Sequence, residues 1–588
     1  MKLSDYIVRF LEENGIDIVF GYIGGAITHL VQSVHDNAGV RFVQVYHEQT
    51  AAFAAEGYAR RSGKFGVAMA TSGPGATNLI TGIGDAFFDS IPVLYITGQV
   101  NTYEYKYDKK IRQQGFQETD IVSIVRPITK YAALISNPTC IRTELEKALF
   151  HARSGRPGPV VLDIPMDVQR AEIDPETLPR FIVPVIPDTD GVGAALEQIV
   201  LAVQRAQRPL LLAGGGVISS GAKDELLRFA QTNGIPVVTS LMGKGVFPEE
   251  DRLFVGMIGS YGNRCANIAL ANTDLLIVVG SRLDTRQTGT LLTSFVRQGD
   301  IVHVDIDPAE LSEHRIDRKY KVCMDVKHFL LTITGAMKTK PECGAWLSHI
   351  ASLKKAYSQQ SEVSRFVTNS MPYRIIDMLN RYSQDDQQYF VDIGQNQMWS
   401  AQGLRIRDKQ RFYTSGGMAP MGYAIPAAIG ASFAGNFKEH IFAVVGDGGL
   451  HISSQALLLL SQYQLPIKVI VMNNQSLGMI TQFQDLYFNK NRVGTTKDSG
   501  YLIPDLAALA TAYFLPHFII DKNNINDASY LEKILTDRTA AVIECRIGED
   551  TTVSPKISVN TPIEDVSPKL DRDEMKKAMV IDLYDGEK

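Results

Sequence analysis

Cysteine, long apolar runs and clustered positive charge are scarce in this sequence. Its five cysteines are scattered through 588 residues and form no C-x-x-C pair, which argues against a disulfide framework or a structural zinc site and fits a reducing cytoplasm. No uncharged apolar run reaches the roughly 18 residues of a membrane span. The first residues lack the layout of a signal peptide. With no long Lys/Arg run and a net charge of −5, nothing indicates a nucleic-acid surface.

Strand-like and helical patterns alternate along most of the chain. This alternation predicts an α/β fold with parallel sheets covered on both faces, and the length predicts about three such doubly wound domains. We expect a first domain at residues 1–168, a proline-rich linker at 169–189, a central domain at 190–335, a polar linker at 336–370, a third domain at 371–550, and a tail or lid with a short helix at 551–588.

Thirteen short runs predict the strands of these domains. In the first domain they are residues 16–20, 42–45, 65–69, 93–97 and 160–163. In the central domain they are residues 209–212, 237–239, 275–279 and 301–304. In the third domain they are residues 389–392, 441–445, 468–472 and 541–545, with a helix expected at about 454–462.

The third domain carries the most specific motif. The strand 441–445 runs into Gly446-Asp447-Gly448-Gly449, and the strand 468–472 runs into Asn473-Asn474. Asp447 and Asn474 therefore lie at the carboxyl ends of parallel strands, the edge where open α/β sheets bind ligands. Carboxylate and amide oxygens suit Mg²⁺, and glycines let a backbone approach phosphate. The alternative is an ordinary G-D-G turn followed by an unrelated Asn-Asn turn. The combination of strand, G-D-G, helix, strand and N-N disfavours this alternative.

This segment resembles the diphosphate-binding motif of thiamine-diphosphate enzymes, which begins G-D-G and ends N-N. The resemblance implies that Asp447, Asn474 and the backbone oxygen of Ser476 bind the metal. It places five further residues near the diphosphate: Gly446, Gly448, Gly449, Gly478 and Met479.

A second motif, His47-Glu48-Gln49, follows the strand 42–45 and opens a helix. Alone, Glu48 is more simply a surface residue whose charge suits the helix dipole. Thiamine chemistry gives it a sharper role, because a carboxyl hydrogen-bonded to the pyrimidine ring favours the tautomer that activates the cofactor. Such a carboxyl should lie in a low-dielectric pocket that raises its pKa.

Several motifs together resemble the large catalytic subunit of acetolactate synthase (acetohydroxyacid synthase). The resemblance is collinear over about residues 1–550. Its motifs are residues 47–60, T-S-G-P-G-A-T-N at 71–78, G-Q-V at 98–100, G-F-Q-E at 115–118, G-R-P-G-P at 155–159, D-I-G-Q-N-Q-M-W at 392–399, T-S-G-G at 414–417, M-G-Y at 421–423 and G-M-I-T-Q at 478–482.

The resemblance implies a role for each matching residue. Glu48 would activate the cofactor, and Gly24 and Gly25 would line the reacting centre. Gln117 would face the bound intermediate, and Phe116 would line the substrate pocket. The remaining positions would hold the cofactor: Pro74 and Asn78 at the pyrimidine, Gly394, Gln395 and Asn396 around the diphosphate, and Met421 beneath it as a wedge. Plain core packing is the alternative for Met421.

The resemblance also implies partners. In this family Glu48 comes from one subunit and the metal motif from another, so we expect a homodimer or a tetramer built from dimers. A regulatory subunit is a further possibility.

The central domain is expected to bind FAD. A glycine-rich turn after the strand 209–212 is a weak dinucleotide signal, and tight packing explains it equally well. Acetolactate synthases, however, bind FAD in this domain without needing it for redox chemistry in the main reaction. The matching positions are Arg156, Gly214, Gly215, Gly216, Arg282, Asp305 and Asp325.

Four positions depart from the family near the acceptor side. The sequence has Phe483 in place of a Trp, Met166 in place of a Lys, Ser260 in place of a Met and Asn101 in place of a Pro, while Arg286 is kept where the family holds the acceptor carboxylate. A smaller ring and a missing cation leave room for a bulkier acceptor, although neutral drift explains them equally well. Residues 562–566 resemble relatives from polysaccharide gene clusters.

We therefore expect an enzyme that decarboxylates a 2-oxo acid, with pyruvate as the donor, and joins the two-carbon acetyl unit to an acceptor carbonyl. The acceptor is either a second pyruvate or a ketone such as a nucleotide-linked keto-deoxysugar. The alternatives are a simple 2-oxo acid decarboxylase, a flavin-using pyruvate oxidase and a non-catalytic scaffold on the same fold.

Overall fold

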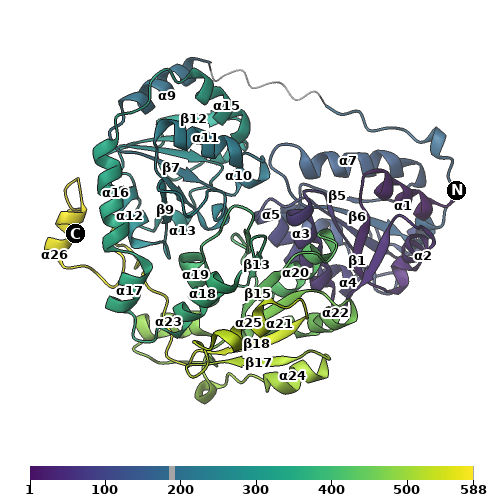
Figure 1. Ribbon diagram of the computed structural model, residues 1–588. Coiled ribbons are helices and arrows are strands. Elements are labelled where there is room, and N and C mark those ends of the chain that lie inside the picture. The colour runs from purple at the N-terminus through teal and green to yellow at the C-terminus, as the bar shows by residue number, and fades with distance from the viewer. Residues whose placement is uncertain (185–192, 587–588) are drawn as a thin grey trace.

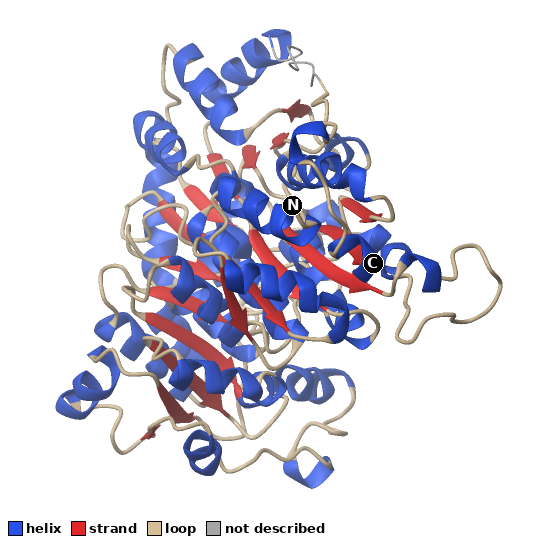
Figure 2. Cartoon of the chain, turned by 90° about the vertical axis from the view of Figure 1, so that its right-hand side faces the viewer, coloured by secondary structure: helices blue, strands red, loops and turns tan. Residues whose placement is uncertain are grey.

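The computed structural model describes residues 1–184 and 193–586, which form three six-stranded parallel sheets with helices packed around them (Figure 1, Figure 2). The predicted α/β class with three parallel-sheet domains is confirmed. Residues 185–189 of the predicted linker lie outside the described residues. Cys140, Cys265, Cys343 and Cys545 are free thiols. Among the described helices, none combines the length and the apolar character that a membrane crossing requires.

The first domain holds a sheet of order β2-β1-β3-β4-β6-β5. Its strands are β1 (Ile18–Tyr22), β2 (Arg41–Gln44), β3 (Gly66–Ala70), β4 (Val93–Gln99), β5 (Tyr131–Leu134) and β6 (Val160–Pro165). Its helices are α1 (Leu3–Glu13), α2 (Thr28–Asp36), α3 (Glu48–Ser62), α4 (Pro74–Asn78), α5 (Ile80–Phe88), α6 (Ile121–Val125), α7 (Ile141–Arg153) and α8 (Met166–Gln169). Every residue of β3, β4 and β6 is buried, as expected for strands covered on both faces.

The central sheet has the order β12-β11-β10-β7-β8-β9. Its strands are β7 (Pro209–Ala213), β8 (Val237–Thr239), β9 (Phe254–Met257), β10 (Leu275–Val279), β11 (Asp300–Asp305) and β12 (Tyr320–Cys323). Its helices are α9 (Gly193–Arg205), α10 (Gly216–Ser219), α11 (Lys223–Asn233), α12 (Arg264–Asn272), α13 (Thr285–Thr288), α14 (Pro308–Ser312) and α15 (Val326–Ala336). Numbered within the domain, the order is 3-2-1-4-5-6, that of dinucleotide-binding folds.

The third sheet has the order β14-β13-β15-β16-β18-β17. Its strands are β13 (Gln388–Val391), β14 (Arg411–Tyr413), β15 (Ile441–Gly446), β16 (Ile467–Asn473), β17 (His517–Ile520) and β18 (Ala541–Arg546). Its helices are α18 (Met371–Tyr382), α19 (Gln395–Gly403), α20 (Ala424–Ala434), α21 (Asp447–Ile452), α22 (Leu457–Gln462), α23 (Gly478–Tyr487), α24 (Leu506–Ala512) and α25 (Ala528–Thr536). This order matches that of the first sheet strand for strand.

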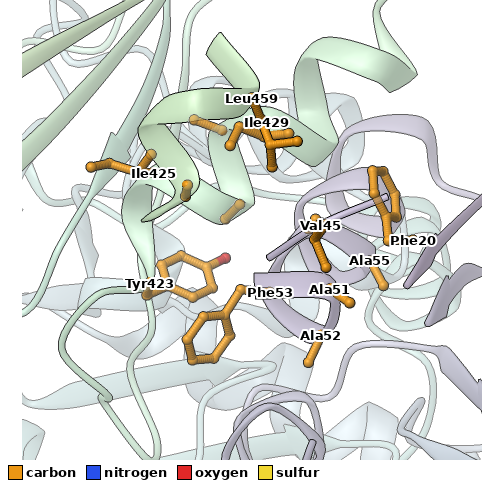
Figure 3. Close-up of a cluster of buried hydrophobic side chains, with 14 of the residues drawn as sticks. Phe20, Val45, Ala51, Ala52, Phe53, Ala55, Tyr423, Ile425, Ile429 and Leu459 are labelled. Atoms are coloured by element: carbon orange, nitrogen blue, oxygen red, sulfur yellow. The ribbon is translucent and has the colours of Figure 1, made fainter. Parts of the chain in front are cut away.

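The first and third domains pack through α3 and α20. A Cβ on Gly57 would collide with the backbone of Ala427, and one on Gly430 with the backbone of Ala54, so only glycine permits this approach. The two contacts fix an antiparallel register, because the later residue of α3 meets the earlier residue of α20. Apolar side chains of both helices share one core, in which the rings of Phe53 and Tyr423 lie 5.5 Å apart (Figure 3).

Two segments differ from expectation. Residues 336–370 are not a plain connector, because they form α16 (Gly344–Ala356) and α17 (Gln359–Phe366). Trp346, on α16, lies in the core of the central domain. The apolar face of α16 therefore stabilises a helix, although the polar residues around it favour a linker in the sequence. The helix expected at 454–462 corresponds to α22, and a second helix, α21, precedes it and starts at Asp447.

The tail begins on the third domain and ends on the central one. Ile563, Val566 and Met575 join the core around α12 and α16, and α26 (Arg572–Ala578) supplies the expected short helix (Figure 1). Arg264 is fully buried, pairs with Glu362, and donates to the carbonyl oxygens of Val566 and Pro568. The tail is therefore fixed to the central domain by both apolar packing and polar contacts.

Candidate active site

The predicted metal ligand Asp447 lies where β15 ends and α21 begins. Its Oδ1 accepts hydrogen bonds from Gly448 N at 2.7 Å and from the Tyr501 hydroxyl at 2.8 Å. Its Oδ2 is buried and has no partner with hydrogen-bond geometry among the described residues. Burial raises the pKa of this carboxyl above its ordinary value, and the Tyr501 hydroxyl and the backbone N–H groups of Gly448, Gln475 and Ser476 oppose the shift. A buried oxygen with no donor fits a cation ligand.

The second predicted ligand, Asn474, lies on the neighbouring strand at the same edge of the sheet. The register pairs Gly446 with Met472, so Asp447 and Asn474 follow the ends of adjacent strands. Asn474 Oδ1 accepts a hydrogen bond from Ser476 N at 3.2 Å. No group of three His, Cys, Asp or Glu residues suited to a metal occurs in the described ranges. A site made of one carboxylate, one amide and a backbone oxygen would suit Mg²⁺.

Glycines let the side chains around these ligands pack directly against the backbone. A Cβ on Gly478 would collide with Gln395 Oε1 and Asn474 Nδ2. A Cβ on Gly448 would lie 3.0 Å from Met421 Cε, which places the predicted wedge beside the predicted diphosphate cradle. Gly394 has φ = 136° at the start of α19, a conformation that favours glycine. The residues present therefore fit a diphosphate and its metal.

Asp392 holds the backbone around this cradle together through hydrogen bonds. It is fully buried, and its carboxylate accepts hydrogen bonds from the backbone N–H groups of Ile393 at 2.8 Å, Gly422 at 3.0 Å and Ala424 at 3.0 Å. Burial raises its pKa to about 6 although these donors oppose the shift. The carboxylate ties the turn after Met421 to the end of β13. Asn396 donates to the carbonyl oxygen of Asp392 at 2.7 Å.

Glu48 forms a second polar group, in the first domain. It is the first residue of α3 and is 7% exposed. Its Oε2 accepts a hydrogen bond from Asn78 Nδ2 at 2.9 Å, and its Oε1 faces the turn at Gly75. Asn78 was expected to contact the pyrimidine, and the structure also places it on the carboxyl that would activate the cofactor. Pro74 opens α4, the helix that ends at Asn78.

Gln117 lies against the turn that precedes Pro74, and Phe116 is its neighbour in the chain. Gln117 has φ = 62°, unusual for a residue with a side chain, and packs against Gly73. Strain of this kind often marks functional sites. Phe116 is 84% exposed in the single chain. At the neighbouring turn, a Cβ on Gly24 would collide with Thr71, whereas Gly25 has open space.

The two polar groups lie at opposite ends of the helix pair. Arg60 donates to the Tyr423 hydroxyl at 2.8 Å, which places the start of α20 at the C-terminal end of α3. Glu48 lies twelve residues earlier on α3, about 18 Å away at the helical rise. Tyr46, close to Glu48, instead donates to Gln462 Oε1 at 3.1 Å, at the far end of α22. One chain alone therefore does not bring Glu48 and Asp447 together.

A cavity of about 560 Å³ lies between the three domains. It opens beside β7 and β10, where the strand order of the central sheet reverses, and dinucleotides bind at such reversals. Six of the seven predicted flavin positions line it: Arg156, Gly215, Gly216, Arg282, Asp305 and Asp325.

Contacts within the protein account for some of the predicted flavin positions. The seventh, Gly214, packs where a Cβ would collide with the carbonyl oxygen of Gly280, so close packing explains it. Arg156 donates to Glu310 and Ser90 at 2.7 and 2.8 Å. Asp325 caps α15. Burial raises the pKa of Asp305.

The acceptor-side residues fall into separate places. Arg286 and Ser260 line the same cavity, and the Arg286 guanidinium lies 6.0 Å from the Tyr261 ring. The Tyr261 hydroxyl contacts Met479 Sδ at 3.3 Å, which links the cavity to the metal motif. Phe483 is half exposed on α23 with its ring 4.7 Å from that of Tyr487. Met166 begins α8 in the first domain and is partly buried.

Two residues that contact the predicted metal ligands were not predicted from the sequence. Tyr501 reaches Asp447 from a loop, and Thr551 reaches Asn474 from the tail, with its Oγ1 3.1 Å from Nδ2. Each is far from the motif in sequence. No local sequence pattern marks Tyr501. The position of Thr551 shortly after the last strand, β18, is a weak signal.

Comparison with known proteins agrees with this geometry. Three domain models of thiamine pyrophosphate enzymes match the chain: the N-terminal TPP binding domain over residues 1–124, the central domain over 196–333 and the C-terminal TPP binding domain over 392–545. The fold and the two polar groups thus define a thiamine pyrophosphate enzyme.

The relatives narrow the family. The acetolactate synthase large subunit of Corynebacterium glutamicum is 38% identical over 572 residues, covering 95% of this chain and 89% of that protein. That of Lactococcus lactis is 36% identical, covering 94% of both chains. A probable acetolactate synthase large subunit of Methanocaldococcus jannaschii is 38% identical, covering 87% and 86%. The chain belongs to the acetolactate synthase family of thiamine pyrophosphate enzymes.

Proposed function

We propose that this protein decarboxylates pyruvate and joins the two-carbon acetyl unit to a second pyruvate. The observation that carries the proposal is the buried Oδ2 of Asp447, to which no described residue donates a hydrogen bond, beside Asn474 at a glycine-rich sheet edge. Thiamine diphosphate, when bound with Mg²⁺, supplies a ring that holds the electron pair released as CO₂ leaves. The names of the similar proteins support a carboligase rather than a simple decarboxylase or an oxidase.

The chain's own residues have distinct tasks in this proposal. Asp447, Asn474 and the backbone oxygen of Ser476 hold the metal, and Met421 supports the cofactor from below. Glu48 holds a proton at the pyrimidine edge, with its carboxyl oriented by Asn78. Gly24, Gly25 and Gln117 line the reacting centre, and Phe116 lines the substrate pocket. Arg286 binds the acceptor carboxylate.

We also propose that the site forms between two copies of the chain. The supporting observation is the separation of Glu48 from the Met421 turn along α3 and α20. Mixing and reassembling Glu48→Gln and Asp447→Asn chains should restore about a quarter of wild-type activity in a symmetric dimer, since half of the dimers gain one intact site. No recovery, with mixed dimers verified by mass spectrometry, would contradict a shared site. Because relatives are named large subunits, a smaller regulatory subunit is a further expected partner.

FAD is the proposed occupant of the 560 Å³ cavity, without a redox role in the main reaction. The supporting observations are the strand order of the central sheet and the six lining residues. Purified protein should retain flavin absorbance that persists when pyruvate is added without oxygen. Bleaching under those conditions would favour a pyruvate oxidase.

A larger ketone, such as a nucleotide-linked keto-deoxysugar, is the second candidate acceptor. It is favoured by Phe483, which presents a half-exposed ring where the family has a larger indole. The loss of a cation at Met166 points the same way.

One experiment tests the reaction and separates the acceptors. Purified protein is incubated with thiamine diphosphate, Mg²⁺, FAD and pyruvate, with and without candidate ketones, and products are identified by mass spectrometry. Acetolactate is expected from pyruvate alone. Fast acetolactate formation that no ketone competes with rules out the sugar acceptor, and a failure to release CO₂ rules out the proposal.

A further inference from the structure

Three amide side chains are buried together at the metal group. Gln395, Asn474 and Gln482 are 4%, 5% and 8% exposed. Asn474 is a proposed metal ligand and Gln395 a predicted part of the diphosphate cradle. Gln482 ends the motif at 478–482 and has no task in the proposed function. Their hydrogen bonds form one directed series that starts in the tail.

The series starts at the backbone of Val553. Its N–H donates to Gln482 Oε1 at 3.0 Å, and its carbonyl oxygen accepts from Gln482 Nε2 at 3.1 Å. A donor and an acceptor on one backbone residue allow only one orientation of this amide. The tail therefore fixes which end of Gln482 faces Gln395.

Gln395 takes its orientation from this contact. Its Nε2 donates to Gln482 Oε1 and to the carbonyl oxygen of Thr551, both at 3.1 Å. Its Oε1 then accepts from the Thr551 hydroxyl at 2.7 Å and from Asn474 Nδ2 at 3.3 Å. All four hydrogen-bonding positions of this amide are occupied.

Asn474 is the end of the series. Its Nδ2 donates to Gln395 Oε1 at 3.3 Å and to Thr551 Oγ1 at 3.1 Å, which uses both of its N–H bonds. Among the described residues, its Oδ1 accepts only from Ser476 N, which leaves one lone pair. A flipped amide would place oxygen against Gln395 Oε1. The unused acceptor of the network is thus the oxygen that a metal requires.

We propose that Gln482 and Thr551 are positioning residues that hold the amide oxygen of Asn474 toward the metal. Neither would touch the metal or the substrate. The Thr551 hydroxyl is the central part of the device, because it donates to Gln395 while accepting from Asn474. The tail, through Thr551 and Val553, is then a structural part of the metal site. This inference rests on the proposed function, since it concerns how the same site holds its metal.

Thr551→Val is the sharpest test, because it keeps the shape of the side chain and removes only the hydroxyl. Mn²⁺ binding to the whole protein with thiamine diphosphate is measured by the electron paramagnetic resonance signal of free Mn²⁺. The dissociation constant should rise roughly 10–100-fold, as for lost outer partners of metal ligands. The Mg²⁺ concentration for half-maximal activity should rise by the same factor.

Two variants serve as controls. Thr551→Ser restores the hydroxyl and should return the Mn²⁺ affinity toward the wild-type value. Thr552→Val makes the same chemical change at the next residue, whose side chain is exposed, and should bind Mn²⁺ like the wild type. Gln482→Met removes the amide at the other end of the network and decides the question if Thr551→Val is not recovered folded.

The outcomes separate this inference from the proposed function. If wild-type protein binds no Mn²⁺ with thiamine diphosphate, the proposed function fails. If the wild type binds Mn²⁺ and Thr551→Val and Gln482→Met stay within about twofold of it, the positioning role is overturned while the proposed function stands. Lower thermal stability of the metal-free variants with unchanged Mn²⁺ affinity would likewise mean a merely structural role.

Discussion

The first and third domains place six parallel strands in the same order, β2-β1-β3-β4-β6-β5 and β14-β13-β15-β16-β18-β17. In each domain the order reverses between corresponding strands, β1 and β3 in one and β13 and β15 in the other. The predicted ligand-contacting turns follow these strands: Gly24 and Pro74 in the first domain, Gly394 and Asp447 in the third. The shared topology thus presents two equivalent edges to a ligand.

The side chains at these edges differ in kind. The first domain offers a carboxyl, Glu48, that already has the amide N–H of Asn78 as its partner. The third offers a carboxyl, Asp447, with one oxygen that lacks a hydrogen-bond partner in the described part of the chain. The first arrangement suits proton exchange with an organic ring, and the second suits a cation. The comparison teaches that the fold decides where a ligand lies, while the residues after the strands decide the chemistry.

The largest expected effect comes from breaking the first-domain edge. Glu48→Gln should lower the rate of CO₂ release by about 10²–10⁴-fold, the range for a lost acid–base group. Binding of thiamine diphosphate and Mg²⁺ should persist, because the metal group is untouched. Stopped-assay CO₂ release and cofactor titration measure the two properties. Full activity of this variant would remove Glu48 from the mechanism.

A substitution at the third-domain edge should weaken binding of the metal instead. Asp447→Asn keeps the hydrogen bond from Tyr501 but removes the charge, so affinity for Mg²⁺ should fall by more than the roughly 10–100-fold cost of losing an outer partner. Excess Mg²⁺ should recover part of the activity, which it should not do for Glu48→Gln. Calorimetric titration of metal and cofactor checks the difference. Equal Mg²⁺ dependence of the two variants would contradict the division of labour.

A smaller effect is expected where the two domains touch. Gly57→Ala places a Cβ against the backbone of Ala427, and overpacking of this kind costs about 1–3 kcal/mol. Denaturant unfolding measures the loss. Gly63→Ala is a poor control because Gly63 has φ = 70°. Gly335→Ala on α15 has open space and a helical position, so it should be neutral or stabilising. A neutral Gly57→Ala would mean that α3 and α20 shift apart easily.

The smallest effect concerns pH. Asp85 is fully buried between the domains and accepts a hydrogen bond from Ser415, and its burial raises its pKa to about 8. In the unfolded chain an Asp titrates near about 3.9, so the folded state binds the proton more tightly. Its stabilising contribution is complete below about pH 4 and is lost as the pH rises through about 8. Asp85→Asn should flatten this fall in thermal stability, and an unchanged slope would contradict it.

The strands that sequence patterns missed share one property. β5, β9, β12, β14 and β17 each lie at the edge of a sheet. Edge strands pair on one side only and are short here, three or four residues each. β5 is half buried along its whole length, and β9 contains Gly256 with φ = 142°. Apolar runs as short as those of β5, β9 and β17 do not by themselves distinguish a strand from a buried helix segment.

The site divides in the same way. Asp447 and Asn474 were predictable because strand ends and their turns are contiguous in sequence. Tyr501 and Thr551 were not, because each reaches the metal group across at least 54 residues of chain. The antiparallel register of α3 and α20, which separates Glu48 from Asp447, depends on helix packing between domains. Sequence motifs therefore predict candidate parts of the site, and packing decides which of them lie together.

Thr551 and Val553 come after β18, the last strand of the described sheets, and still Thr551 accepts a hydrogen bond from Asn474 while Val553 donates one to Gln482, at the other end of the same series. Proteolytic cleavage between β18 and Thr551 would therefore keep every strand of the described sheets and free the amide of Asn474 to turn. Such clipping would lower the affinity for the metal while leaving the three sheets intact.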